Sequence, residues 1–243
     1  CVRQFPASIR FCTTGRDLVL TESEDLEGQI LEESRLFFGG SRDEEIRATE
    51  QFQQLMRRMN RVKSLEELIY IYIGAVGGNA TFLLNIPPMP NGLLHENDVK
   101  RLEEFGSWKK KSFTHNLMST AHIFSENEDP THPVSDLTDD TSETWFQPES
   151  SELPVEITIC LDGSYNLGYL VLKEAVCYSQ RVEKFEIFVK EGEIWNSIYT
   201  GTVIGYKKII SVKGQKAQKV KIVLHDFRVL PLLSFVGIYP ESL

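Results

Sequence analysis

Alternation of apolar side chains with other residues in the second half of the chain constrains its fold more than any other feature. A β-strand points successive side chains to opposite faces, so a period of two predicts strands buried on one face. The alternating positions are Val155, Ile157, Ile159, Leu161; Phe185, Ile187, Val189; and Val220, Ile222, Leu224. Further strands are predicted around 169–173, 194–200, 207–212 and 233–239, with turns at Asp162-Gly163, Glu191-Gly192 and Lys213-Gly214. About seven or eight short strands predict an all-β sandwich or jelly roll over residues 113–243.

Residues 62–112 have a different pattern, with helical periodicity on both sides of an apolar run. A capping box at Ser64 begins a predicted helix that ends at Gly77-Gly78, where glycine can adopt a positive φ. Residues 80–86 are apolar without alternation, so we expect a strand that is buried on both faces. A second helix is predicted over about 95–110. Helix, buried strand and helix together indicate a parallel α/β unit, which makes the fold class α+β overall.

The first 61 residues are rich in glutamate, arginine and glutamine and offer little apolar surface for a core. A helix is predicted from Ser41, where a second capping box precedes a helical stripe, and a strand near 18–20. The chain is therefore expected to comprise a partly helical or disordered segment over 1–61, a unit over 62–112 and a β-sandwich over 113–243.

Composition excludes two classes of function. The 243 residues carry a net charge of −9 at pH 7. Proteins that bind the phosphates of nucleic acids concentrate lysine and arginine, so no nucleic-acid partner is expected. No apolar run approaches the roughly 20 residues that a membrane-spanning helix needs, so no membrane span is expected either.

Four motifs in residues 62–112 are similar to those of a known family. They are Ser64-Leu-Glu-Glu-Leu68, Ala75-Val-Gly-Gly-Asn79, Leu83-Leu-Asn-Ile-Pro-Pro88 and the segment from Gly92 to Gly106. Together they resemble the end of the catalytic barrel in the family 29 α-L-fucosidases. The resemblance implies that this stretch is the end of a (β/α)8-like, TIM-type barrel, with its last helix, its final inner strand and a helix that leads out. Gly78 is a difference, since members of the family commonly carry arginine there.

Motifs in the alternating region extend this resemblance. They are Asn116-Leu117, Asp136-Leu-Thr-Asp139 with Thr144-Trp145, Ser179-Gln-Arg-Val182, Gly201-Thr-Val-Ile-Gly205 and Pro231-Leu-Leu-Ser-Phe-Val-Gly-Ile-Tyr239. They resemble the discoidin-like domain, of the coagulation factor 5/8 type C kind, that some of these fucosidases carry. This domain is a galactose-binding-like jelly-roll sandwich. The resemblance covers residues 62–243, and the first 61 residues do not match it.

The resemblance implies an enzyme that hydrolyses terminal α-L-fucose from oligosaccharides by a retaining mechanism, with a fucosylated glycan as partner. Retaining glycosidases need two carboxyl groups about 5 Å apart. In the family both precede the final barrel strand, and the Trp-Phe-Asp type motif of the nucleophile is absent from this sequence. We therefore assign no catalytic residue and expect the chain, as the C-terminal part of such an enzyme, to be inactive by itself. A glycan-degrading parent favours an exported protein, periplasmic or extracellular.

A non-catalytic carbohydrate-binding module or a purely structural sandwich is the alternative function. Asn85 ends the predicted buried strand, where inner residues of a barrel approach the ligand, so it is a candidate for contact with a sugar. Gln180 and Arg181 are candidates because a Gln-Arg pair begins a predicted strand. Packing between domains is the other interpretation of that pair.

Asp136, Asp139 and Asp140 lie close enough in sequence to supply hard oxygen ligands to a structural calcium ion. The resemblance implies such an ion near this loop, although Phe235 stands where many sugar-binding modules of this kind carry glutamate. No other cofactor is predicted.

A single strand of an eight-stranded barrel cannot close on itself. The apolar faces of residues 62–112 therefore need another surface to cover them, and the sandwich is the candidate within this chain. We expect the helices to pack against the sandwich or to leave an apolar patch exposed.

Overall fold

The computed structural model describes residues 2–4, 9–12, 18–20, 62–89, 91–141 and 143–241. Its contacts divide the chain into a first unit, Cys1–Ser64 with Leu84–Glu103, and a second unit, Leu65–Leu83 with Glu104–Leu243. In this division one helix and part of another group with the sandwich, and the boundary at residue 113 stays a prediction.

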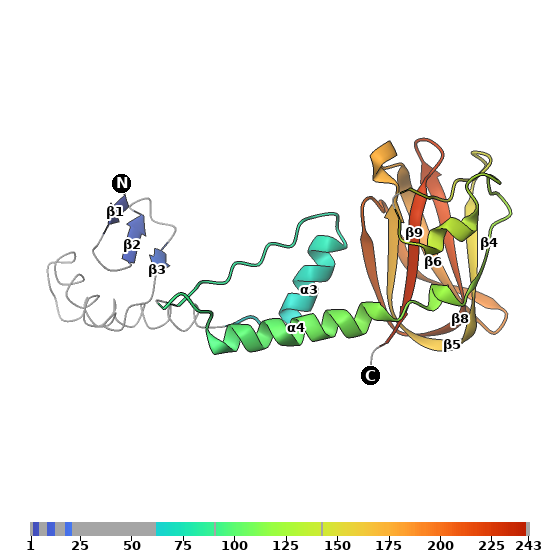
Figure 1. The fold of residues 1–243 in the computed structure, drawn as a ribbon. Coiled ribbons are helices and arrows are strands. Elements are labelled where there is room, and N and C mark those ends of the chain that lie inside the picture. Colours follow the sequence, from blue (N-terminus) through green and yellow to red (C-terminus); the bar gives the residue numbers. More distant parts are fainter. Residues whose placement is uncertain are drawn as a thin grey trace. The chain divides into compact units, whose positions relative to one another are not determined.

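The first unit contains a small antiparallel sheet (Figure 1). Its strands are β1 (Val2–Gln4), β2 (Ile9–Cys12) and β3 (Leu18–Leu20), in that order. The strand predicted near 18–20 is confirmed as β3. The helix predicted from Ser41 lies outside the described residues.

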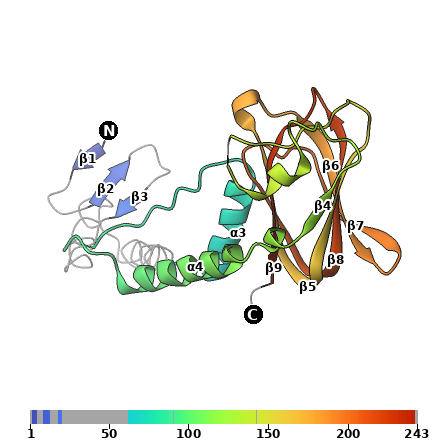
Figure 2. The same ribbon diagram turned by 45° about the vertical axis from the view of Figure 1, so that its right-hand side comes forward.

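Six antiparallel strands make up most of the second unit. They are β4 (His122–Phe124), β5 (Val155–Glu174), β6 (Val182–Glu191), β7 (Ile194–Gly201), β8 (Lys208–Phe227) and β9 (Leu233–Pro240). They follow the order β4-β5-β8-β6-β7, and β9 also pairs with β5. Figures 1 and 2 show the strands curving around a common core, which confirms a β-sandwich.

Two of the predicted turns are wrong. Asp162-Gly163 lies inside β5 and Lys213-Gly214 lies inside β8, each of which is 20 residues long. The two strands stay paired beyond two register shifts, one between Cys160 and Tyr165 and one between Leu167 and Tyr169, opposite Lys213-Gly214. The shifts bend the ladder instead of reversing the chain. The turn predicted at Glu191-Gly192 is confirmed, since Gly192 has a φ of 59° between β6 and β7.

The bend gives β5 different outer neighbours along its length. Its first part pairs with β4 at Ile159, and its last part pairs with β9 from Leu167 onward. A strand that changes neighbours in this way links the two layers of a sandwich. The predicted alternating residues are buried between the layers, with at most 3% exposure: Val155, Ile157, Ile159, Leu161, Phe185, Ile187, Val189, Val220, Ile222 and Leu224.

Helix α3 (Leu65–Val76) ends where the sequence predicts, but for a different reason. The residue with positive φ is Asn79, at 67°, and not a glycine. A Cβ at Gly77 would lie 2.4 Å from the carbonyl oxygen of Ile73 in the helix and 2.9 Å from the Cβ of Ile209 on β8, so the helix end and its approach to β8 both require glycine. The Asn79 amide then joins the helix end to the sandwich, donating to the carbonyl of Ile204 at 3.0 Å and accepting from the N–H of Lys207 at 2.9 Å.

The strand predicted over 80–86 is not present in this structure, so the described residues contain no parallel α/β unit. These residues are irregular, and the side chain of Leu83 is 89% exposed. None of the N–H groups of 81–86 donates to a backbone carbonyl of a described residue. A parallel strand is stabilised by hydrogen bonds to neighbouring strands, and no described strand pairs with this segment.

The helices pack on the sandwich, as predicted. The contact is a second core that is rich in aromatic rings. We call this the aromatic cluster; it comprises Tyr72, Phe82, Phe105, Trp108, Phe113, Tyr169 and Tyr239. Phe105, Trp108 and Phe113 come from the second half of α4 (Glu96–Thr114), which is longer than predicted. The ring of Trp108 lies 5.9 Å from that of Tyr72 and 6.0 Å from that of Tyr169 on β5, both edge to face. Such pairs contribute roughly 0.5–1.5 kcal/mol each beyond their buried area.

Replacement of Tyr72 tests whether this cluster holds α3 on the sandwich. Tyr72 is 7% exposed and contacts the rings of Phe82, Phe105 and Trp108. We expect Tyr72→Ala to lower the free energy of unfolding by about 3 kcal/mol, because it removes a buried ring and leaves a cavity. Chemical denaturation of the whole chain measures this change.

Tyr72→Phe is the matched control. The structure gives the Tyr72 hydroxyl no hydrogen bond to a described residue, so the ring should account for the packing of this side chain. The free energy of unfolding of Tyr72→Phe should then differ from that of the unchanged chain by less than about 0.5 kcal/mol. Equal loss in the two variants would show that the hydroxyl, and not ring packing, matters at this position.

Candidate functional site

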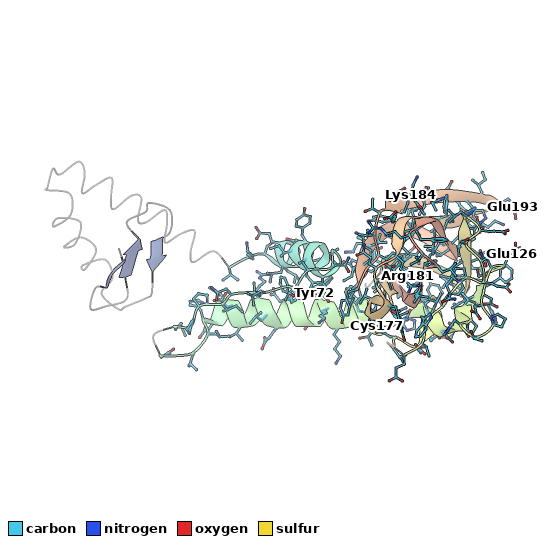
Figure 3. All side chains as sticks on the ribbon, turned by 90° about the horizontal axis from the view of Figure 1, so that it is seen from above. Tyr72, Glu126, Cys177, Arg181, Lys184 and Glu193 are labelled. Carbon is cyan, nitrogen blue, oxygen red and sulfur yellow. The ribbon has the colours of Figure 1, made fainter. Side chains whose placement is uncertain are left out.

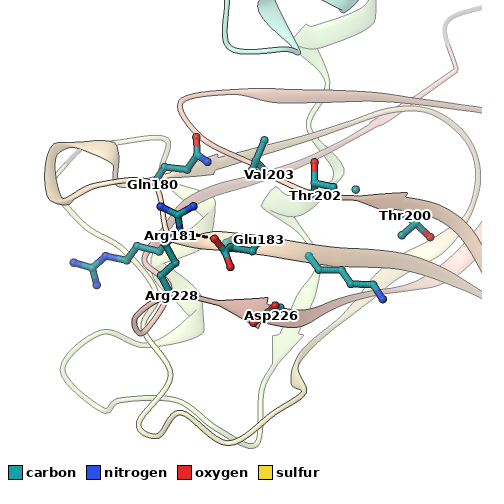
Figure 4. Close-up of a pocket in the computed structure, with 11 residues that line it drawn as sticks. Gln180, Arg181, Glu183, Thr200, Thr202, Val203, Asp226 and Arg228 are labelled. Carbon is teal, nitrogen blue, oxygen red and sulfur yellow. Dashed lines mark hydrogen bonds and ion pairs between the residues drawn. The ribbon is translucent and has the colours of Figure 1, made fainter.

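A pocket of about 540 Å³ opens in the second unit where β6 begins and where β7 and β8 end (Figure 4). Its volume falls within the range of about 300–1,000 Å³ that is typical of ligand pockets. The lining residues come from three segments that are distant in sequence: Gln180, Arg181, Val182, Glu183 and Lys184; Thr200, Gly201, Thr202 and Val203; and Asp226 and Arg228.

A buried carboxylate fixes two of these segments. Glu174, the last residue of β5, is 2% exposed. Its Oε1 accepts hydrogen bonds from the N–H groups of Arg181 at 2.7 Å and Val182 at 3.0 Å. Its Oε2 accepts one from the N–H of Gly205 at 2.6 Å. Three backbone donors therefore satisfy the buried charge, and the carboxylate holds the start of β6 and the segment after β7 together.

Sequence reasoning did not identify Glu174, although one signal was present. Leu170, Leu172 and Glu174 alternate along β5, and the two leucines are fully buried. The period of two therefore places Glu174 on the core face, where a carboxylate needs hydrogen-bond donors.

Gln180 and Arg181 both line the pocket, but they differ in what their side chains do. The guanidinium of Arg181 donates from Nη1 to the carbonyl of Leu230 at 2.7 Å and from Nη2 to that of Tyr178 at 3.3 Å. Arg181 therefore stabilises the surrounding loops, and Figure 3 shows it within the sandwich. The amide of Gln180 is exposed and makes no hydrogen bond to another described residue. Their role in binding a sugar stays a prediction.

The rest of the pocket is polar and nearly balanced in charge. Glu183 forms an ion pair with Arg228, which raises the pKa of that guanidinium. Lys184 faces Asp226 across the β6–β8 ladder. These carboxylates do not form a glycosidase pair, because Glu183 is bound to Arg228 and Asp226 is exposed with no hydrogen bond to a described residue.

Asn85 lies in the first unit, on the irregular segment that follows residue 83. Its side chain is exposed and makes no hydrogen bond to a described residue. A contact between Asn85 and a sugar stays a prediction.

The three aspartates proposed for calcium are engaged in different ways. Asp139 accepts hydrogen bonds from the N–H of Thr141 at 3.1 Å and from the hydroxyl of Thr144 at 2.7 Å. Asp140 forms an ion pair with Lys173 on β5. Asp136 lies on the short 3-10 helix η2 (Val134–Thr138), where burial and the charge of Asp139 raise its pKa. The described part of the chain contains no group of three or more histidine, cysteine, aspartate or glutamate residues arranged to hold a metal ion.

The alpha-L-fucosidase family model matches residues 44–112. The chain is 28% identical over 185 residues to putative alpha-L-fucosidase 1 of Oryza sativa subsp. japonica and 27% identical over 188 residues to alpha-L-fucosidase 1 of Arabidopsis thaliana. Each alignment covers 74% of this chain. The chain is therefore similar to alpha-L-fucosidases, over residues 44–112 by the family model and over about three quarters of its length by the two plant relatives. Because the family match begins at residue 44, the expectation that the first 61 residues do not match is wrong for residues 44–61.

Solved structures of this family share the fold. A putative alpha-L-fucosidase from Bacteroides thetaiotaomicron superposes with a TM-score of 0.70 at 27% identity, over 75% of this chain and 41% of that one. A family 29 fucosidase from Ruminococcus gnavus, determined in complex with fucose, gives the same TM-score and identity over 75% of this chain and 38% of that one. The chain spans only 36–37% of the length of the two curated plant fucosidases. Among its described residues, no helix has the length and apolar character needed to cross a membrane.

Removal of the buried carboxylate tests how the pocket is built. We expect Glu174→Ala to lower the free energy of unfolding by about 3 kcal/mol or more, because it leaves three backbone N–H groups without an acceptor at roughly 1–3 kcal/mol each. Glu126→Ala is the matched control, since Glu126 is exposed and has no hydrogen bond to a described residue. Denaturant unfolding of both variants measures the difference, and similar stability of the two would contradict this role of Glu174.

Calcium is expected to leave the thermal unfolding temperature of the chain unchanged, because Asp139 and Asp140 already have partners within the protein. An ion that binds the folded state raises this temperature, and the rise grows with the logarithm of the ratio of its concentration to its dissociation constant. Thermal unfolding with added calcium and with a chelator measures the effect. A rise of several degrees that Asp139→Asn abolishes would establish a calcium site instead.

Proposed function

We propose that this chain forms the C-terminal part of an enzyme that removes terminal α-L-fucose from oligosaccharides with retention of configuration. The observation that carries the proposal is the match of residues 44–112 to the alpha-L-fucosidase family. The fold shared with solved fucosidases supports it. A fucosylated glycan is then the substrate of the whole enzyme.

The chain by itself does not catalyse this reaction under our proposal. Retention needs a nucleophilic carboxylate and a second carboxyl group that acts first as acid and then as base, about 5 Å apart. Both groups must be held rigidly by their surroundings. The pocket carboxylates lack this arrangement, since Glu183 is bound to Arg228 and the side chain of Asp226 is exposed. Under this proposal the catalytic pair comes from a part of the enzyme other than this pocket.

Residues 80–86 form the last inner strand of the barrel in the proposed enzyme. Two observations support this assignment: Leu83 is 89% exposed, and the N–H groups of 81–86 donate to no backbone carbonyl among the described residues. Neighbouring barrel strands would supply those hydrogen bonds and would bury the apolar side chains. The same segment would then change from an irregular conformation to a strand.

The sandwich corresponds to the discoidin-like domain in this proposal. Its antiparallel strand order and its fully buried core support the assignment. The aromatic cluster fixes α3 and the second half of α4 on the sandwich. We infer that the sandwich positions the end of the barrel through these helices.

Carbohydrate binding without catalysis is the second candidate function. The observation that favours it is the polar pocket between β6, β7 and β8, which holds exposed side chains with hydrogen-bonding groups. Binding by this pocket does not depend on catalytic carboxylates.

Release of 4-nitrophenol from its α-L-fucoside tests the catalytic proposal. We expect no release above background by the chain alone. We expect release by a chimera in which the part of the Arabidopsis thaliana relative upstream of its aligned region precedes residues 62–243, because the chimera restores the barrel. Proton NMR of the first product formed should show α-L-fucose, as retention requires.

The upstream part of the relative without residues 62–243 is the control, and we expect it to be inactive. Turnover by the chain alone would overturn our assignment of it as non-catalytic. Turnover by the control at the rate of the chimera would show that this chain contributes nothing to the active site.

A further inference from the structure

We propose that the pocket between β6, β7 and β8 binds one uncharged sugar residue of a glycan. This inference deepens the second candidate function and rests on it. It is independent of catalysis, because binding at the pocket can occur in a chain that cleaves no bond.

The pocket presents hydrogen-bonding groups that the fold itself does not use. The side chains of Gln180, Thr202 and Asp226 are exposed and make no hydrogen bond to another described residue. They include an amide that both donates and accepts, a hydroxyl that does the same, and a carboxylate that accepts. A pyranose ring offers several hydroxyl groups, each both donor and acceptor, and so complements this mixture. Figure 4 shows these side chains around one space, although they come from three segments.

The charges around the pocket disfavour a charged ligand. Glu183 and Arg228 neutralise each other in an ion pair, and Lys184 faces Asp226 across the ladder. The guanidinium of Arg181 is already bound to two backbone carbonyls. An anion would meet the two carboxylates, and a cation would meet the lysine and the arginines. A neutral polyol is repelled by neither set of charges.

The walls of the pocket are rigid before any ligand arrives. The Glu174 carboxylate holds the N–H groups of Arg181 and Val182, and Val182 is fully buried. Gly201 is packed against the core residue Phe185, whose ring would lie 2.4 Å from a Cβ at that position, so this part of the wall has no room to move inward. A preformed site loses less conformational entropy on binding. The lining contains no aromatic ring, so we expect a dissociation constant of about a millimolar, the range of a few hydrogen bonds without stacking.

Binding by the whole chain is measured by saturation-transfer NMR with four probes. L-Fucose and D-galactose are neutral, N-acetylneuraminic acid is an anion and D-glucosamine is a cation. We expect saturable binding of at least one neutral sugar and binding at least about fivefold weaker for both charged sugars. Asp226→Ala and Thr202→Val should each weaken binding of the neutral sugar about tenfold, as loss of one hydrogen bond to the ligand does.

Glu126→Ala is the matched control, because it removes an exposed carboxylate from a loop outside the pocket. It should leave binding unchanged, and thermal unfolding should show that all three variants remain folded. Lack of saturable binding of both neutral sugars overturns the proposal, as does binding that neither pocket variant weakens. Tighter binding of a charged sugar overturns the ligand class. An active chimera with a pocket that binds nothing would refute this inference alone, while an inactive chimera with sugar binding would refute only the catalytic proposal.

Discussion

The antiparallel ladder between β5 and β8 supports every other part of the second unit. Both strands bury alternate side chains in the main core, and beyond the bend they carry Tyr169 and Ile209, on which the helices pack. The curvature of the sheet also brings the C-terminal ends of the two strands together. Glu174 at the end of β5 binds the N–H of Val182, and Val182 pairs with Phe227 at the end of β8. The core, the docking surface for the helices and the pocket therefore all follow from one pairing.

Residues 80–86 show how far a local pattern depends on its surroundings. An apolar run that ends at Pro87-Pro88 has the composition of a buried strand, and the family resemblance assigns it that role. A strand also needs hydrogen-bond partners on its edges, and no described strand pairs with this run. The chain therefore leaves Leu83 exposed while its neighbour Phe82 joins the aromatic cluster. The apolar character belongs to the sequence, whereas the strand would belong to the assembled barrel.

The candidate pocket could be predicted only in part. Gln180 and Arg181 were identified because a polar pair at a strand start is unusual, and both line the pocket. Their different roles depend on the carbonyl of Leu230, which is 49 residues away from Arg181. Asp226 enters the pocket because β8 pairs with β6, a long-range pairing that the local alternation of apolar residues does not specify. The alternation along β5 places Glu174 on the same face as the buried Leu170 and Leu172. The three N–H groups that it binds could not be read from the sequence.

Local sequence patterns specify the alternating strands of the sandwich, the extent of α3 and the apolar character of residues 80–86. Each of these depends on side chains a few positions apart, which is the range over which a local pattern acts. The tertiary structure alone decided that β5 and β8 bend at Asp162-Gly163 and Lys213-Gly214 instead of turning. It also decided that the helices join the sandwich and that the pocket forms. These outcomes depend on contacts between segments that are distant in sequence. Such contacts stabilise the fold only once the whole sheet has closed around its core and buried its apolar side chains.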